Sequence, residues 1–553
     1  MKKGGVRMGI YLNPGANRFR EMLRSEIYVD KSGMLSYLNK FFATEQKYVC
    51  ISRPRRFGKS MAANMISAYY DRSTDAKELF QGMDIAQQDD FARYANQQDV
   101  LFINMQEFLS ETKSIDELLL MLRKSLLWDL LEEYPDFHYF DETNLTRTMK
   151  DIFKKTQRQF VILIDEWDCI FREYKDRTAE QKQYLDFLRD WLKDKDYIGL
   201  AYMTGILPIK KYGTHSALNM FMEFSMTDAG PIASYTGFTE DEVQKLCQEY
   251  QMSFPEIKAW YDGYCLRQTL PAGKSECRTM PIDIYSPRSV VQSMLLGELS
   301  DYWNQTETFN ALQIYIDMNF EGLKDTILEL MAGGSRKIDI RTFSNDMATF
   351  HSYEDILTLL IHLGYLGYDS EHKSVFIPNK ELMDEFAAAT AASKWSEIIK
   401  SVKCSDELLQ ATWQREAETV AKGIEQAHFE TSHIQYNSEA ALSYTVSLAY
   451  YSARQYYTIV RELPTGKGFA DLVFLPRQKY ADKPAMVVEL KWNQSAETAI
   501  QQIKEKKYVR ALEGYCGEIL LVGISYDKET RNHGGEIEVV IEDKKGSSPN
   551  CPR

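Results

Sequence analysis

The feature that most constrains the fold is a series of short apolar runs in the N-terminal part of the chain, with amphipathic stretches between them. Runs of five to eight residues are typical of buried strands, and Met61–Tyr70 and Ile115–Leu131 have the periodicity of helices. Strands that alternate with helices form parallel sheets with both faces covered. The sequence therefore predicts an α/β fold. The predicted strands are Lys47–Ser52, Val100–Met105, Phe160–Ile164 and Tyr197–Thr204.

Length and charge bound the organisation and the partners of the chain. At 553 residues it exceeds what one hydrophobic core supports, so we expect several domains. The formal net charge of −14 gives an acidic surface, which repels the phosphate backbones of nucleic acids. This charge excludes a protein that coats DNA in general. It leaves room for a protein that binds nucleic acid through a local basic groove or through bound metal ions.

The cysteines and the apolar segments bear on the compartment. The eight cysteines are spread along the chain without a CxxC pair, so we expect reduced thiols instead of disulfides or a zinc site. The N-terminus lacks the apolar run of a signal peptide, and no stretch approaches the roughly 20 apolar residues that span a bilayer. We therefore expect a cytoplasmic protein with no membrane partner. The sequence leaves its oligomeric state open.

The pattern of predicted elements changes at about residue 235, which predicts a domain boundary. Residues 1–234 hold the α/β pattern. In residues 235–395 short helical patterns dominate, broken by loops such as Pro271–Pro281. The segment Ile356–Ile377 has the pattern of a helix followed by a short hairpin. We therefore expect a helical middle domain, a pattern that is compatible with a small winged element.

A third region, residues 396–542, has a different order of elements. Residues 396–430 are expected to be a helical connector. The remainder predicts a domain of order α-β-β-β-α-β, closed by a strand at Glu518–Ile524. Residues 543–553 are polar and contain Gly, Ser and Pro, so we expect a disordered tail there.

A phosphate-binding loop is predicted between the first strand and its helix. The run Arg53–Ser60 (RPRRFGKS) matches GxxxxGK[ST], except that Arg53 stands in place of the first glycine. Such a loop curls backbone N–H groups around phosphate at a helix N-terminus, and Gly58 allows that close approach. Lys59 would neutralise the terminal phosphates of ATP, and Ser60 would ligate Mg²⁺. The alternative is a basic loop before a helix, but the preceding buried strand favours the nucleotide site.

Three more residues of this loop are expected to contact the nucleotide: Arg53, Arg56 and Phe57. One of the loop arginines could contact a phosphate in the manner of an arginine finger. An equal alternative is that Arg53, Arg55 and Arg56 pair with acidic residues nearby.

Two carboxylates follow the strand Phe160–Ile164 and strengthen this interpretation. Ligands of open α/β sheets bind at the carboxyl ends of the strands. Asp165 would hold Mg²⁺ through water, and Glu166 would act in catalysis by polarising the attacking water. Asp168 either joins the site or lies at the surface. Thr204 ends the fourth strand and could sense the terminal phosphate, although strands often end in Thr-Gly for turn reasons alone.

Taken together, these motifs resemble the AAA-ATPase-like family of bacterial proteins. The resemblance implies a P-loop NTPase fold in which the first glycine of the loop is usually absent, as at Arg53. It also implies a C-terminal domain of the PD-(D/E)XK nuclease superfamily. Tyr28–Lys31 lies near the nucleotide or contributes to packing, and for Trp260–Tyr264 we favour domain packing. The resemblance rests on Tyr28–Ser32, Arg53–Ser60, Leu163–Asp168, Thr204–Leu207 and Trp260–Tyr264.

A second constellation, Asp471 followed by Glu489 and Lys491, has the D…ExK pattern of that superfamily. Residues i and i+2 of a strand share a face, so Glu489 and Lys491 point the same way. A neighbouring antiparallel strand can bring Asp471 beside them. The two carboxylates would bind Mg²⁺, and Lys491 would position the attacking water or stabilise developing charge. These three residues are therefore the predicted catalytic residues of this domain.

Two helical residues are candidates for the same site. Glu439 is the expected additional metal ligand, because this superfamily often takes one from the preceding helix. Gln502 resembles a family glutamine near the site. For both, an exposed helix position is an equal alternative. Phe469 and Ala470 stand where relatives often carry a basic residue, which puts activity in question more than fold.

Two functions compete at this point. The first is an ATP-binding and ATP-hydrolysing protein whose metal-dependent nuclease domain acts on nucleic acid, with DNA favoured over RNA. The second is an ATP-driven switch or scaffold whose nuclease-like domain binds nucleic acid without cleaving it. The intact D…ExK set favours the first.

Overall fold

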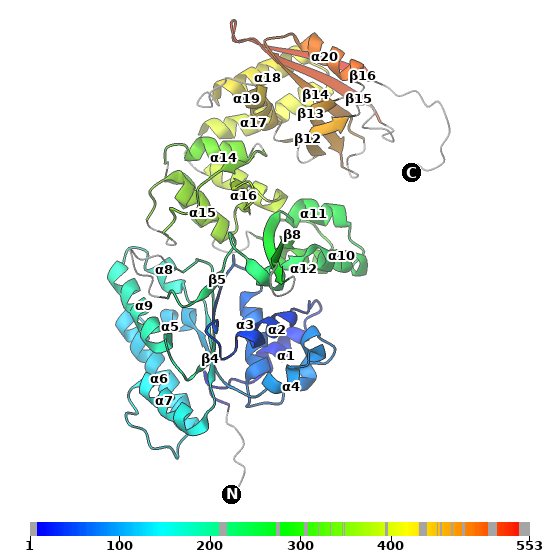
Figure 1. Cartoon of the computed structure of the whole chain (residues 1–553). Helices are drawn as coiled ribbons and strands as arrows, with labels where there is room; N and C mark the ends of the chain where they lie inside the picture. The colour runs from blue at the N-terminus through cyan, green and yellow to red at the C-terminus, as the bar shows by residue number, and fades with distance from the viewer. Residues whose placement is uncertain are drawn as a thin grey trace. The chain divides into compact units, whose positions relative to one another are not determined.

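The computed structural model divides the chain into two compact units. One consists of Met1–Leu312 and Lys337–Glu385, and the other of Gln313–Arg336 and Phe386–Arg553. Both are drawn in Figure 1. The domain boundaries at residues 234, 395 and 542 stay predictions. The structure describes residues 8–209, 218–271, 277–303, 308–318, 320–331, 333–344, 347, 349–392, 396–430, 439–450, 452–453, 456–465, 468–477, 480, 482–506 and 517–540.

The first unit is built on a five-stranded sheet of order β2-β3-β4-β1-β5, in which every pairing is parallel. The four predicted strands are confirmed, since each apolar run is buried between helices. The fifth was missed because it has three residues and no apolar run of its own. The strands are β1 (Tyr48–Ser52), β2 (Asp99–Asn104), β3 (Phe160–Asp165), β4 (Ile198–Gly205) and β5 (Met222–Phe224).

Helices cover both faces of this sheet, with α5–α9 on one side and α1–α4 on the other (Figure 1). Ser114 caps α6, accepting a bond from the backbone N–H of Glu117 at 3.2 Å. The Glu117 side chain accepts from the N–H of Lys113 at 2.9 Å, one residue before the position that a capping box requires. The helices are α1 (Asn17–Leu23), α2 (Gly33–Phe41), α3 (Lys59–Tyr70), α4 (Phe91–Tyr94), α5 (Met105–Glu111), α6 (Ile115–Glu133), α7 (Leu145–Thr156), α8 (Cys169–Glu173) and α9 (Thr178–Leu192).

The rest of this unit contains more strand than the sequence predicted. The expected loop Pro271–Pro281 is wrong in its described residues, because Pro271 ends β7 and residues 277–281 belong to β8, in a three-stranded antiparallel sheet of order β6-β8-β7. Residues 272–276 lie outside the described residues. The proline and glycine residues of this segment obscure the alternation of a strand. The elements are β6 (Phe238–Thr239), α10 (Glu240–Glu249), α11 (Phe254–Tyr261), β7 (Tyr264–Pro271), β8 (Cys277–Tyr285) and α12 (Pro287–Leu296).

The expected helix and hairpin at Ile356–Ile377 are confirmed. Helix α15 (Tyr353–Leu363) precedes the antiparallel hairpin of β10 (Gly367–Asp369) and β11 (Ser374–Phe376). The further elements of the middle region are α13 (Thr308–Asp317), α14 (Leu323–Met331), β9 (Arg336–Lys337) and α16 (Lys380–Ala392).

The C-terminal sheet has the order β12-β13-β14-β15-β16, with β14 and β15 parallel and the other pairs antiparallel. The predicted α-β-β-β-α-β order is confirmed, but the prediction that the fourth strand closes the domain is wrong. Strand β16 adds a further edge, and its glycines and glutamates hid it in the sequence. The elements are α19 (Glu439–Ala449), β12 (Tyr457–Thr465), β13 (Gly468–Pro476), β14 (Ala485–Trp492), α20 (Ala496–Glu505), β15 (Ile519–Tyr526) and β16 (His533–Val540).

The two faces of this sheet have separate cores. Leu490 and Val488 of β14 share a core with helices α17 (Ser396–Trp413) and α18 (Ala417–Glu430). The expected connector 396–430 is therefore a structural part of this domain. Val487, on the alternate face, packs with α20. The predicted disordered tail lies outside the described residues.

Candidate functional sites

The phosphate-binding loop has the curled form that the sequence predicted. Gly58 caps helix α3 in the left-handed region, with a φ of 82°. No atom of the described residues lies within 4 Å of where its Cβ would be, so the backbone is open to an approaching group. The Nζ atom of Lys59 donates across the loop to the carbonyls of Arg53 at 2.9 Å and Pro54 at 2.8 Å. Burial lowers the pKa of Lys59 to about 8, and nearby carboxylates, first Asp168, oppose the shift.

A cavity of about 880 Å³ opens in front of this loop. Six predicted site residues line it, and so do Tyr28 and Lys31 of the N-terminal motif. Another part of the lining is apolar, with Ile27, Phe238 and Val291. The cavity thus combines a phosphate-type loop with a surface that suits a planar base. The six residues are Arg56, Phe57, Gly58, Lys59, Ser60 and Glu166.

Asp165 and Thr204 lie side by side at the carboxyl ends of β3 and β4. These strands are parallel neighbours, with Ile164 paired to Met203. The hydroxyl of Thr204 donates to Oδ1 of Asp165, which also accepts from the N–H of Glu166 at 3.1 Å. Both side chains are buried, and among the described residues neither belongs to the cavity lining. This position is compatible with a metal held through water.

For Asp168 the sequence left open a place in the site or a place at the surface. It is fully buried, and its Oδ2 atom accepts from the N–H groups of Ile206 at 2.9 Å and Leu207 at 2.8 Å. It therefore fixes the turn after β4 to the turn after β3, and it is not a surface residue.

The structure corrects the prediction for the Arg53 side chain. This residue is fully buried and is not among the described residues that line the cavity. Its Nε donates to Thr236 at 3.0 Å and its Nη1 to the carbonyl of Phe224 at 3.0 Å. The guanidinium therefore supports the loop from behind. Arg56 donates from Nη1 to the carbonyls of Tyr302 at 2.7 Å and Trp303 at 2.6 Å.

Two arginines that the sequence analysis did not single out also line the cavity. Arg172 of α8 donates to Glu166, and Arg288 belongs to the first turn of α12. No sequence motif marks either residue, since only the fold brings them close to the loop. For Arg172, the signal that could have found it is its place six residues after Glu166 on a short helix.

The motif Trp260–Tyr264 has the packing role that we favoured. The ring of Tyr264 lies edge-on to Phe57 of the phosphate loop, with centroids 5.3 Å apart. Its hydroxyl donates to the carbonyl of Gly364 at 2.5 Å. Gly263 has a φ of 108°, and a Cβ there would meet the carbonyl oxygen of Pro378 at 2.1 Å. The motif therefore ties the loop to the helix–hairpin segment.

In the C-terminal sheet, the structure brings Asp471, Glu489 and Lys491 together. Leu472 of β13 pairs with Val488 of β14, which sets Asp471 next to Glu489. The Oδ2 atom of Asp471 accepts from the N–H of Leu490 at 2.7 Å. Lys491 donates from Nζ to Oε1 of Glu489 at 3.1 Å.

Glu489 carries the features expected of a metal ligand. It is 2% exposed, and its Oε2 atom is buried with no hydrogen-bond partner among the described residues. Burial, and then the charge of Asp471, raises the pKa of Glu489 to about 7. Gln502 of α20 donates to its Oε1 atom, so this glutamine does lie at the site. Two adjacent carboxylates with a free oxygen fit Mg²⁺, which prefers oxygen ligands.

Glu439 remains an expectation. It is the first residue of α19, but its side chain lies outside the described residues.

Comparisons with known proteins give a family match for each of the two segments that contain these residues. Residues 14–214 match the model of a family described as "Predicted AAA-ATPase", and residues 441–536 match the model of the "PD-(D/E)XK nuclease superfamily". An uncharacterized protein in the vnfD 5′ region of Azotobacter chroococcum mcd 1 is 23% identical over 295 residues. That match covers 51% of each chain, so this chain spans about half the length of the curated relative.

Two solved structures align with this chain at lower sequence identity than that relative. The ORC2 protein of Aeropyrum pernix is 10% identical with a TM-score of 0.28, and the alignment covers 66% of this chain and 97% of that one. Cdc6p of Pyrobaculum aerophilum is 8% identical with a TM-score of 0.24, covering 66% and 96%.

The described part of the chain contains no helix long and apolar enough to span a bilayer. Strands β1–β4 with the glycine-lysine-serine loop lie within the first matched segment, and the D…ExK cluster lies within the second. The chain therefore joins a domain of the predicted AAA-ATPase family to a domain of the PD-(D/E)XK nuclease superfamily.

Proposed function

We propose that this protein binds and hydrolyses Mg²⁺–ATP in the 880 Å³ cavity of its first unit and uses the Asp471–Glu489–Lys491 cluster to cleave nucleic acid, DNA in preference to RNA. The observation that carries the proposal is the unpartnered, buried Oε2 of Glu489 beside Asp471, within the part of the chain that the structure describes. A buried carboxylate oxygen without a donor is unfavourable unless an ion or a proton compensates it.

In the ATP cavity, the phosphates would lie on the backbone of the loop around Gly58. Lys59 would exchange its bonds to the loop carbonyls for bonds to the phosphates, because the phosphate oxygens carry negative charge and the carbonyls are neutral. Ser60, which is exposed at the start of α3, would ligate Mg²⁺, and Asp165 would hold that ion through water. The base would contact the apolar wall at Tyr28 and Phe238.

In the nuclease-like site, Asp471 and Glu489 would hold the metal ion. When bound, that ion would polarise the scissile phosphate and activate the attacking water. Lys491, which donates to Glu489, would stabilise charge on the reacting phosphate. Gln502 keeps Glu489 oriented.

The test separates the two activities. Purified protein is incubated with plasmid and with single-stranded DNA and RNA, in Mg²⁺ or Mn²⁺, with and without ATP. We expect cleavage that Lys491→Ala abolishes, and ATP hydrolysis that Lys59→Ala abolishes while the circular dichroism spectrum stays unchanged. Binding of DNA with no cleavage in either metal would instead favour the switch or scaffold.

One observation keeps that second function in view. Glu166, the residue expected to polarise the attacking water, is engaged by Arg172. If wild-type protein binds ATP but shows no turnover, the first unit acts as a nucleotide-dependent switch.

A further inference from the structure

A second pocket adjoins the nucleotide cavity. Its volume is about 160 Å³, and four of its lining residues also line the larger cavity. All of its lining residues belong to the first compact unit. The shared residues are Arg55, Arg56, Arg172 and Glu173. The two spaces therefore have a common wall, which starts at the phosphate loop.

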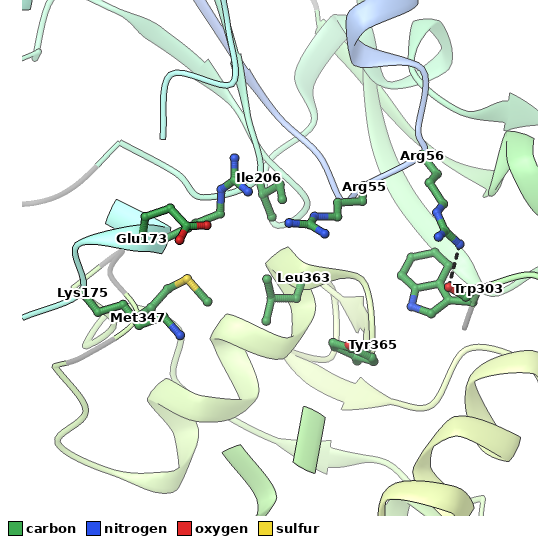
Figure 2. A pocket seen from close by; sticks show the side chains of 10 residues that line it. Arg55, Arg56, Glu173, Lys175, Ile206, Trp303, Met347, Leu363 and Tyr365 are labelled. Atoms are coloured by element: carbon green, nitrogen blue, oxygen red, sulfur yellow. Dashed lines mark hydrogen bonds between the residues drawn. The ribbon is translucent and has the colours of Figure 1, made fainter. Parts of the chain in front are cut away.

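The polar lining of this second pocket consists mostly of donors. Figure 2 shows the Arg55 guanidinium directed into the space between Ile206 and Leu363, with Lys175 at the far side. Trp303 is 3% exposed, and its indole N–H is buried with no acceptor among the described residues. Among the described residues of the lining, Glu173 is the one carboxylate. Such a set of donors suits a ligand that is anionic and rich in oxygen acceptors.

The remaining wall is apolar and partly aromatic. Met347, Leu363 and Tyr365 face the same space (Figure 2). A cavity of about 150 Å³ holds one benzene-sized body, so a single planar ring system fits this volume while its substituents reach the opening. Flat apolar walls next to cations are the arrangement by which proteins hold a base together with its phosphate.

We propose that this pocket binds one nucleotide unit, with the base against Leu363 and Tyr365 and the phosphate on Arg55 and Lys175. The unit comes either from a free mononucleotide or from the end of a single strand. Because Arg55 also lines the larger cavity, occupation of one space changes the affinity of the other. That coupling rests on the proposed ATP site, whereas the binding itself does not.

The experiment uses the full-length protein without ATP. Deoxythymidine monophosphate and a 5′-phosphorylated oligothymidine are titrated by calorimetry against wild type, Leu363→Glu and Leu363→Gln. Leu363 is partly exposed, so both variants tolerate a polar side chain. The carboxylate of Leu363→Glu would pair with Arg55 and repel the phosphate, so we expect a loss of about tenfold or more. The amide variant, of the same shape, should stay within about threefold of wild type.

Further variants separate the two sites. Lys59→Ala should leave this binding unchanged; if Lys59→Ala weakens it and Leu363→Glu does not, the probe occupies the larger cavity and the proposal is overturned. Lys175 is partly exposed, so Lys175→Ala should fold, and it should weaken binding even if Leu363→Glu fails to fold. Binding of either probe supports the site. The probe that binds more tightly shows whether the nucleotide unit is a free mononucleotide or the end of a single strand. No binding of either, or equal binding by Leu363→Glu and Leu363→Gln, overturns the proposal.

Discussion

Arg172 donates a hydrogen bond from Nη2 to Oε2 of Glu166, and its Nε lies 3.5 Å from Oδ2 of Asp168. One guanidinium thus contacts both the expected water-polarising carboxylate and the buried carboxylate that fixes the turn after β4. Glu166 has a φ of 54°, a left-handed conformation that is uncommon for this residue type. Backbone strain of this kind is often found at functional sites. Movement of Glu166 toward a bound nucleotide would therefore have to break its bond with Arg172.

Replacing Glu166 with Gln should leave ATP binding intact and slow hydrolysis by about tenfold or more, because base or water-orienting help contributes roughly 10²–10⁴ to such a rate. Phosphate release and the affinity for a non-hydrolysable ATP analogue would be measured together. Glu173→Gln is the matched control, since this carboxylate lines the same cavity but is exposed and has no expected role in hydrolysis. Equal rates for Glu166→Gln and wild type would exclude Glu166 as the catalytic carboxylate.

Replacing Arg53 with Met should destabilise the protein by about 3 kcal/mol, because it leaves buried acceptors without their donor. The phosphate loop would lose its support at Thr236 and at the carbonyl of Phe224. The free energy of unfolding in urea reports this change. Arg55→Met, at an exposed position on the same loop, should change it by about 0.5 kcal/mol or less. A stable Arg53→Met protein would show that the buried guanidinium is dispensable for the fold.

Mn²⁺ should raise the thermal midpoint of the nucleotide-free protein, since an ion that binds the folded state stabilises it. Asp471→Asn should remove most of that rise, because it weakens the pair of carboxylates at Glu489. Ser60→Ala is the control for metal bound at the ATP site, and it should retain the rise. If the two variants behave in the opposite way, the stabilising ion belongs to the first unit.

The pH dependence of metal binding follows from Glu489. Its pKa is raised from 4.5 to about 7 by burial and by Asp471, so the metal-free folded protein retains a proton that the unfolded chain releases. By itself this group makes the metal-free protein less stable as the pH rises from 4.5 to about 7. Metal must displace that proton. We therefore expect the Mn²⁺ affinity to rise by up to about tenfold per pH unit below 7 and to level off above it. Titrations of wild type and Glu489→Gln would show this, the variant having a flatter profile.

The sequence predicted those parts of the fold and site whose residues carry a local pattern. The strand that ends at Asp165 and the D…ExK pair at Glu489 are marked by apolar runs that stop at charged residues. Arg172 and Trp303 have no such mark, because only tertiary packing brings them to the loop. Arg53 shows the opposite error: a basic residue in a phosphate loop suggested a contact with phosphate, yet burial directs its donors to the protein. The hairpin at Pro271 was missed because its turn residues outweigh its alternation.

The position of β16 has a practical consequence for any shortened form of the protein. Strand β15 (ILLVGISY) is buried along its whole length and pairs with β16 on one side. A chain that ended at the predicted last strand would expose eight residues of unpaired, uncharged, proline-free edge. Edges of this composition pair with other chains and lead to aggregation. Soluble expression of the C-terminal domain should therefore require residues through Val540, and a chain truncated after Tyr526 should accumulate as insoluble protein.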